Sequence, residues 1–218
     1  MIILSDLSEV LISGLWGTDK IIEKKYGTVV AKEFWERHLE THDDFKDLLR
    51  GKISEDCYWT GFLSESYWPF NIYELKRCFM ENMLHDVPGT LALYKSIQSY
   101  PVSFGKHREM NYGRPEIRIV SDHIKERIPY IRDTHSDIFD IVKKYYWSFE
   151  IHMVKSDKDF FKTIINDTGV MSVDELLFID DMSVNVVAAR DAGINSIKFE
   201  NADQLKSEMT KLGFTFKS

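Results

Sequence analysis

The sequence has 218 residues, of which 44% are hydrophobic and 29% are charged, a balance that excludes disordered and fibrous chains. A formal net charge of -7 leaves no excess of basic residues to follow a phosphate backbone, so we expect no nucleic-acid partner. The longest run without a charged residue has ten members, too short for the roughly 20 apolar residues of a membrane span. The first residues lack the pattern of a secretory signal, and Cys57 and Cys78 match neither a disulfide framework nor a zinc spacing. We therefore expect a cytoplasmic protein without a membrane partner, and its oligomeric state stays open.

Five short apolar runs predict strands, most of them buried on both faces of a sheet. They cover residues 1–4, 117–120, 149–154, 176–179 and 196–199. Helical patterns follow at 90–98, 157–167 and 183–192. Strands that alternate with helices predict right-handed crossovers on a parallel sheet. The expected fold class is α/β, with a doubly wound parallel sheet of Rossmann-like type.

The region between the first strand and residue 88 breaks this alternation and predicts helices alone. Its helical patterns cover residues 19–26, 29–38, 43–49, 54–62 and 72–83. No linker rich in Gly, Ser or Pro separates it from the rest, so we expect it to pack on the sheet. The predicted division is a core domain of residues 1–12 and 88–218 with an inserted helical cap domain of residues 13–87.

Polar residues follow the predicted strands at their carboxyl ends, where parallel sheets bind ligands. Asp6 follows the first run, Ser121 the second, Lys155 the third, and Asp180 and Asp181 the fourth. Carboxylates are the hard ligands that Mg²⁺ prefers, while lysine and serine suit a phosphate group. An aspartate can also act as a nucleophile. These residues predict a Mg²⁺ site that receives a small anionic substrate.

The same segments resemble the motifs of the haloacid dehalogenase-like (HAD) hydrolase superfamily, in the family's order. Residues 6–11, Asp-Leu-Ser-Glu-Val-Leu, resemble the first motif, Asp-x-Asp-Gly-Thr/Val-Leu. Ser121 resembles the second motif, and Lys155, in Lys-Ser-Asp-Lys, resembles the third. Residues 178–194, which contain Asp180-Asp181 and Asn185, are similar to the fourth motif of the subgroup with a helical cap after the first strand.

The resemblance implies a role for each matched residue. Asp6 would be the nucleophile of an aspartyl-phosphate mechanism, and Ser121 and Lys155 would hold the transferring group with Asp122 beside them. The implied Mg²⁺ ligands are Asp6, the main-chain carbonyl of Ser8, Asp180 and Asp181, and Asn185 would support them. The implied activity is that of a Mg²⁺-dependent phosphatase for a small phosphorylated metabolite.

One position departs from the family's phosphatases, because Ser8 stands where they have an aspartate that acts as general acid and base. A serine hydroxyl cannot supply this proton near neutral pH, and such a group commonly contributes about 10²–10⁴ in rate. Three explanations stay open: a substrate whose leaving group needs no proton, a non-phosphoester reaction such as dehalogenation or phosphonate cleavage, and a catalytically weak or inactive binding protein. The Asp180-Asp181 pair favours a retained Mg²⁺ site over metal-free dehalogenation.

Other patterns carry weaker expectations. His38 and His42 have a metal-ligand spacing, but Glu40 is misplaced for a metalloprotease, so we expect a solvated helix face. His123 is a candidate proton donor because it follows Ser121 by two residues. The stretch 101–116 predicts a long loop, and such loops are often functional.

Overall fold

The computed structural model describes residues 1–14, 17–99, 113–214 and 216. Its centre is a parallel five-stranded sheet with the order β3-β2-β1-β4-β5. The strands are β1 (Ile2–Ser5), β2 (Glu116–Ser121), β3 (Val142–Trp147), β4 (Leu176–Asp180) and β5 (Asn195–Lys198). The predicted α/β class with a doubly wound parallel sheet is confirmed.

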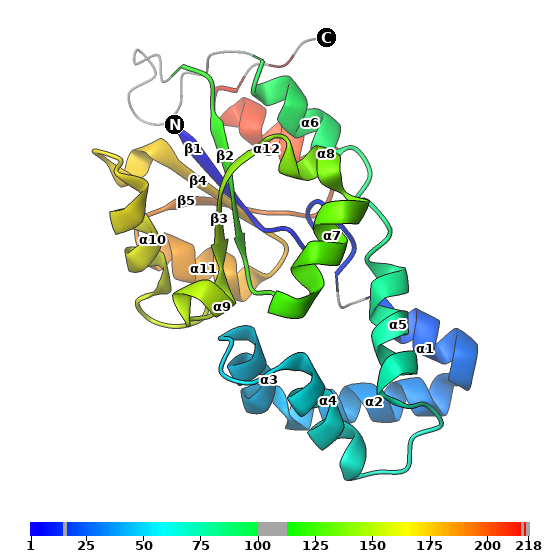
Figure 1. The fold of residues 1–218 in the computed structure, drawn as a ribbon. Coiled ribbons are helices and arrows are strands. Elements are labelled where there is room, and N and C mark those ends of the chain that lie inside the picture. Colours follow the sequence, from blue (N-terminus) through cyan, green and yellow to red (C-terminus); the bar gives the residue numbers. More distant parts are fainter. Residues whose placement is uncertain (15–16, 100–112, 215, 217–218) are drawn as a thin grey trace.

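Helices cover both faces of the sheet, as Figure 1 shows. One face packs against α6 (Thr90–Ile97), α7 (Ile128–Thr134), α8 (Ser136–Phe139) and α12 (Ala202–Lys211). The other face packs against α10 (Phe160–Thr168) and α11 (Ser183–Asp191). Strand β1 shows why both faces need cover: Ile3 joins the first cluster, and Ile2 and Leu4 join the second. Short elements complete this part: the 3-10 turns η1 (Lys125–Arg127) and η2 (Val173–Glu175) and helix α9 (Ser148–Ile151).

The remaining helices form a separate body, here called the helical module (residues 18–82), which lies beyond one end of the sheet (Figure 1). They are α1 (Thr18–Tyr26), α2 (Thr28–Glu40), α3 (His42–Leu49), α4 (Glu55–Ser64) and α5 (Ile72–Asn82). Aromatic side chains such as Phe34, Trp59 and Phe79 make its core. Ser54 caps α4, and Asn71 caps α5. Each cap satisfies backbone N–H groups that a helix start leaves unpaired.

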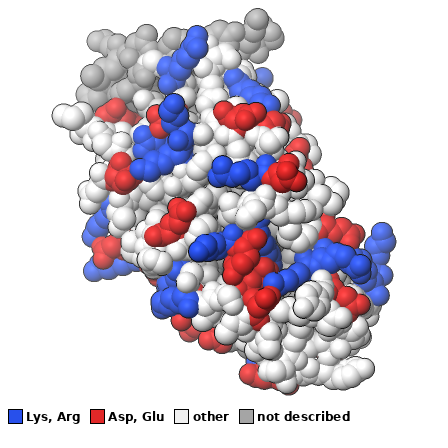
Figure 2. All heavy atoms as spheres, in the orientation of Figure 1, with Lys and Arg blue, Asp and Glu red and all other residues white. Residues whose placement is uncertain are grey.

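The two chain segments that join the helical module to the sheet run side by side. The N–H of Ser13 donates to the carbonyl of His85 at 2.8 Å, and the N–H of Val87 donates to that of Leu11 at 2.9 Å. This pairing brings the entry and the exit of the module together at the end of β1. Figure 2 shows basic and acidic side chains interspersed over the visible face of both parts.

The strand predicted at residues 149–154 is wrong, because the third strand is β3. Strand β3 lies at an edge of the sheet, and its consecutive lysines, Lys143 and Lys144, interrupt the apolar signal. Phe149 and Ile151 instead belong to α9, where they pack into the clusters on opposite faces of the sheet. The alternating apolar residues that predicted a strand therefore lie in a short helix whose side chains pack on both faces of the sheet.

Three further expectations have outcomes here. His38 does not lie on a solvated face: it is buried against Phe34 in the helical module, with Nδ1 3.2 Å from the hydroxyl of Tyr58. Most of the predicted loop at 101–116 lies outside the described residues. Within the described part of the chain, none of the helices has both the length and the apolar character needed to cross a bilayer.

Candidate active site

Three carboxylates meet at the carboxyl end of the two central strands. Asp6 directly follows β1, Asp180 ends β4, and Asp181 comes next in the chain. The N–H of Asp6 donates to the carbonyl of Ile179 at 2.9 Å, which extends the pairing of β1 with β4 up to the site. Each of the three carboxylates can offer an oxygen within 4.8 Å of the other two. This spacing is short enough for one small cation to contact all three, and an oxygen-only donor set suits Mg²⁺.

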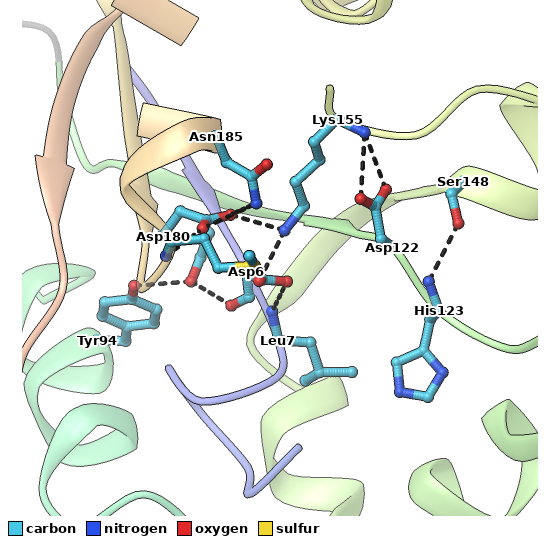
Figure 3. Close-up of polar contacts among 11 residues, drawn as sticks. Asp6, Leu7, Tyr94, Asp122, His123, Ser148, Lys155, Asp180 and Asn185 are labelled. Atoms are coloured by element: carbon cyan, nitrogen blue, oxygen red, sulfur yellow. Dashed lines mark hydrogen bonds and ion pairs between the residues drawn. The ribbon is translucent and has the colours of Figure 1, made fainter. Parts of the chain in front are cut away.

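Lys155 holds two of these carboxylates together (Figure 3). Its Nζ lies 2.7 Å from Asp6 Oδ2 and 2.7 Å from Asp180 Oδ2, and the side chain is only 1% exposed. Burial alone would lower the pKa of Lys155, but Asp180, Asp6 and Asp122 together raise it, so the ammonium stays charged. Burial raises the pKa of Asp6 to about 8, against the opposing effect of Lys155. Without a cation, Asp6 therefore retains its proton near neutral pH, and a cation bound beside it would favour the ionised carboxylate.

Asp180 is oriented by a set of donors on the turn into α11. The side-chain amide of Asn185 donates to both of its oxygens, at 3.1 and 3.2 Å, and the N–H of Met182 donates to Oδ1 at 2.8 Å. Asp181 is less enclosed, and its pKa is raised to about 6, first by burial and then by Asp180. Asp180 is therefore held by protein donors, whereas Asp181 is available to a ligand.

Ser121 and Asp122, at the end of β2, differ in what they contact. Ser121 is fully buried, and its hydroxyl has no hydrogen-bond partner among the described residues. An unpaired buried hydroxyl costs about 1–3 kcal/mol, and a phosphate oxygen would remove this cost. The carboxylate of Asp122 accepts the N–H of Lys155 at 3.1 and 3.2 Å (Figure 3). Asp122 thus holds the main chain of Lys155, while its predicted contact with substrate stays a prediction.

The loop after Asp6 carries the unusual residue Ser8 and an unusual backbone. Glu9, at the position where the family's first motif has glycine, has a φ of 59°, in the left-handed region that glycine adopts most readily. Its side chain accepts the N–H of Gly14 at 2.8 Å, which fixes the loop to the segment leading into the helical module. The loop therefore keeps a glycine-like conformation although its sequence has changed. Glu9 also contributes to the raised pKa of Asp181.

His123 does not have the properties of the proton donor suggested by the sequence. Its ring is buried, and burial, followed by the charge of Arg127, lowers its pKa to about 4. The N–H of Ile124 donates to Nδ1 at 2.9 Å, which places the proton on Nε2. Nε2 has no partner among the described residues. A neutral imidazole can donate a hydrogen bond, but it cannot act as a general acid at neutral pH.

Groups on Leu7, Ser5 and Tyr94, which the sequence did not indicate, support Asp6. The N–H of Leu7 donates to Asp6 Oδ1 at 2.7 Å. The hydroxyl of Ser5 lies 2.7 Å from the main-chain carbonyl of Asp6 and 2.8 Å from the hydroxyl of Tyr94 on α6, in a buried chain of polar groups. Ser5 directly follows the first apolar run of the sequence. Nothing in the spacing of the sequence marked Tyr94, because the fold alone brings α6 beneath β1.

Comparisons with known proteins identify the fold. The chain overlays on a HAD-family enzyme of Bacteroides thetaiotaomicron with a TM-score of 0.73 and 18% identity, covering 95% of this chain and 97% of that one. The same enzyme in complex with magnesium and inorganic phosphate gives a TM-score of 0.68 over 91% and 93%. L-2-haloacid dehalogenase of Xanthobacter autotrophicus, with chloropropionic acid covalently bound, gives 0.61 at 12% identity over 100% and 91%. At these identities the comparison shows a shared HAD-like fold.

The sequence also matches parts of longer curated proteins. Drimenol cyclase of Aspergillus calidoustus is 22% identical over 216 residues, which are 95% of this chain and 35% of that protein. A chloroplast flavin mononucleotide hydrolase of Arabidopsis thaliana is 37% identical over 59 residues, which are 27% of this chain and 24% of that protein. The chain thus spans about a third or less of the length of these curated relatives. No family model matches the sequence.

Proposed function

Because this chain has the HAD-like fold and gathers an acidic cluster beside a buried lysine, we propose that it is a Mg²⁺-dependent hydrolase of small phosphate monoesters. The observation that carries the proposal is the meeting of Asp6, Asp180 and Asp181 at one edge of the sheet, with Lys155 Nζ 2.7 Å from two of them. The similarity to a flavin mononucleotide hydrolase and to a HAD enzyme crystallised with magnesium and phosphate supports it.

The donors present fit a hard divalent cation. We assign the Mg²⁺ contacts to the carboxylates of Asp6 and Asp181 and to the main-chain carbonyl of Ser8, with Asp180 oriented beside them. When bound, Mg²⁺ supplies positive charge that offsets the charge of the three carboxylates and of a phosphate. The raised pKa of Asp6 fits this assignment, because it shows how strongly the protein alone disfavours a second negative charge there.

In the proposed reaction Asp6 attacks phosphorus, its new O–P bond forms, and the bond to the leaving oxygen breaks. The N–H of Leu7 and Nζ of Lys155, each 2.7 Å from an oxygen of Asp6, fix the orientation of this carboxylate. Lys155 also offers its charge to the transferring oxygens, and the unpaired hydroxyl of Ser121 donates to one of them. Fixed donors aimed at developing charge are usually the largest catalytic contribution. Water then hydrolyses the aspartyl-phosphate.

The absence of a carboxylate at Ser8 restricts the substrates that this site can process. Neither Ser8 nor the neutral His123 can protonate a departing alkoxide. We propose that the preferred substrates have leaving groups that are stable as anions, such as phenols. The same reasoning makes hydrolysis of the aspartyl-phosphate slow, because the hydroxyl of Ser8 cannot activate the attacking water as a carboxylate would.

We further propose that residues 13–87 act as a cap domain on a core of residues 1–12 and 88–218. The paired segments at Ser13 and Val87 are placed to serve as its hinge. A cap that opens for substrate and closes against water is a common device in hydrolases. A cytoplasmic location and a small anionic metabolite as the partner complete the proposal.

A panel of substrates tests the proposal. Purified protein is assayed with p-nitrophenyl phosphate, alkyl phosphates and 2-haloacids, each with Mg²⁺ or EDTA. We expect turnover of the aryl ester above all, lost in EDTA and in Asp6→Asn, and retained in the matched control Asp133→Asn on the exposed face of α7. Haloacid turnover that EDTA does not change would establish dehalogenation instead. Binding of phosphate with Mg²⁺ but no turnover would establish a binding protein.

A further inference from the structure

Residues 49–51 of the helical module, here called the docking turn, contact the segment after Ser121 and the segment before Lys155. The hydroxyl of Ser148 donates to the carbonyl of Leu49 at 2.7 Å, and the same hydroxyl accepts the N–H of His123 at 3.1 Å. His152 Nδ1 lies 3.0 Å from the carbonyl of Arg50. The docking turn therefore connects with the loop that follows Ser121 as well as with the segment that precedes Lys155.

Gly51 shows how close this contact is. It has a φ of 70°, and a Cβ built there would lie 3.0 Å from the carbonyl oxygen of Phe149 and 3.1 Å from its Cβ. Both the backbone conformation and the space favour glycine. The helical module and α9 are therefore in close contact at Gly51, and a larger residue would not fit there.

A buried ion pair between Glu55 and Arg127 joins the helical module to η1, and at the docking turn the polar side-chain contact is made by Arg50. Its Nε donates to Asp157 Oδ2 at 3.1 Å and its second guanidinium nitrogen donates to Oδ1 at 2.7 Å, a two-point contact with fixed geometry. The pair is partly buried, with side-chain exposures of 20% and 29%. Arg50 also lowers the pKa of Asp157. Figure 2 shows charged side chains of both signs gathered where the module meets the sheet layers.

Asp157 links Arg50 to the turn that contains Lys155. Its Oδ2 accepts the N–H of Val154 at 3.0 Å, and its own N–H donates to the carbonyl of Val154 at 2.8 Å. These bonds close the turn that contains Lys155, whose N–H is held by Asp122 on the other side. The N–H groups of Val154 and Lys155 are therefore each held by a carboxylate, and one of these carboxylates, Asp157, is itself fixed by the helical module.

We propose that Arg50 is a positioning residue: through Asp157 it fixes the turn of Lys155, so that Lys155 is fully aligned with Asp6 only while the helical module is docked. The expected effect on catalysis rests on the proposed phosphate-ester hydrolysis. The expected effect on the position of Lys155 rests on the contacts alone. Docking of the module then does more than cover the site, because it sets the position of the charge that stabilises the transferring group.

The test compares Arg50→Met, Asp157→Asn and the double variant with Lys52→Met. Lys52→Met is the matched control because Lys52 pairs with Asp47, 2.8 Å distant, and Asp47 also pairs with Arg50 at 3.2 Å; the variant disturbs this pairing and leaves the bonds from Arg50 to Asp157 in place. One readout is amide hydrogen exchange at residues 154 and 155, and the other is kcat and KM for p-nitrophenyl phosphate with Mg²⁺.

We expect Arg50→Met to accelerate exchange at both amides and to lower kcat about 10- to 100-fold, the range associated with small displacements of catalytic groups, with a smaller change in KM. Asp157→Asn should change exchange and kcat in the same direction. The double variant should lose no more activity than either single variant, because both substitutions disrupt the same Arg50–Asp157 contact. Lys52→Met should match the wild type. Arg50→Lys should recover part of kcat, since it keeps the charge but loses the two-point geometry.

Two results would overturn the inference: unchanged exchange at residues 154 and 155 in Arg50→Met, or faster exchange with unchanged kcat. Effects of the two single variants that multiply in the double variant would also contradict it. If the wild type turns over no phosphate ester, the proposed function fails, and the exchange data alone then decide whether Arg50 fixes the turn of Lys155.

Discussion

Replacing Lys155 with methionine tests the charge balance of the site. The substitution keeps most of the side-chain volume but removes the ammonium that lies 2.7 Å from both Asp6 and Asp180. Loss of one partner from a buried ion pair typically costs about 3–5 kcal/mol. Asp180 keeps its bonds to Asn185 and Met182, and Asp6 keeps the N–H of Leu7, so we expect the lower end, about 3 kcal/mol.

The assay is urea unfolding at pH 7.5, first in EDTA and then in Mg²⁺. A loss of about 3 kcal/mol corresponds to a fall of roughly 6–12 °C in Tm for a chain of this size. Mg²⁺ should restore more stability to Lys155→Met than it adds to the wild type, because the cation replaces the missing positive charge. Lys162→Met, which removes an exposed partner of Asp159, should stay within about 0.5 kcal/mol of the wild type.

A cost below about 1 kcal/mol in EDTA would refute this reasoning, since it lies far under the range for a broken buried pair. Equal stabilisation of both proteins by Mg²⁺ would refute it as well. Either result would mean that Lys155, Asp6 and Asp180 do not form one electrostatically coupled cluster.

Three further predictions concern pH, the supporting shell and Ser8. Between about pH 7.5 and 8.5 in EDTA, stability should fall as pH rises, because the raised pKa of Asp6, about 8, means that the folded state binds a proton that the unfolded state has lost; urea unfolding across this range checks it, and a rise in stability would contradict it. This window lies above the range in which His38 and His123 act: their folded pKa values of about 4 make stability rise with pH until the unfolded side chains, with a pKa of about 6.5, have lost their protons. Asn185→Ala should weaken Mg²⁺ binding about 10- to 100-fold by titration calorimetry, while Val184→Ala on the exposed side of α11 should not, and equal affinities would contradict the supporting role. Ser8→Asp should raise turnover of alkyl phosphates relative to p-nitrophenyl phosphate, and an unchanged or lower ratio would show that a missing acid is not what limits the site.

Much of the site could be predicted because its residues occupy strand ends. Asp6 and Asp180 follow apolar runs that had to be central strands, and parallel strands bring their carboxyl ends to one edge. Helix α11 could be placed because Gly193 follows it, but its buried face could not, since Val184 and Val187 are exposed and Val186 and Ala189 are buried. These features are local in sequence, and the topology follows from a few rules.

The features that were missed depend on contacts between distant segments. Strand β3 could not be predicted because an edge strand needs no continuous apolar run: Lys143 is exposed, and Lys144 is half-buried and pairs with Asp167. The Ser5–Tyr94 contact and the Arg50–Asp157 pair join residues 89 and 107 positions apart. A single sequence gives no information on such pairs, because each partner alone has the pattern of an ordinary surface or core residue.

Detection of a phosphorylated Asp6 tests the central claim most directly. The protein is mixed with p-nitrophenyl phosphate and Mg²⁺, quenched in acid within seconds, digested and analysed by mass spectrometry. We predict a phosphoryl adduct on the peptide that contains Asp6, accumulating because Ser8 cannot activate water for its hydrolysis, and absent from Asp6→Asn. Steady turnover of the ester without any adduct, together with full activity of Asp6→Asn, would contradict the assignment of Asp6 as the nucleophile.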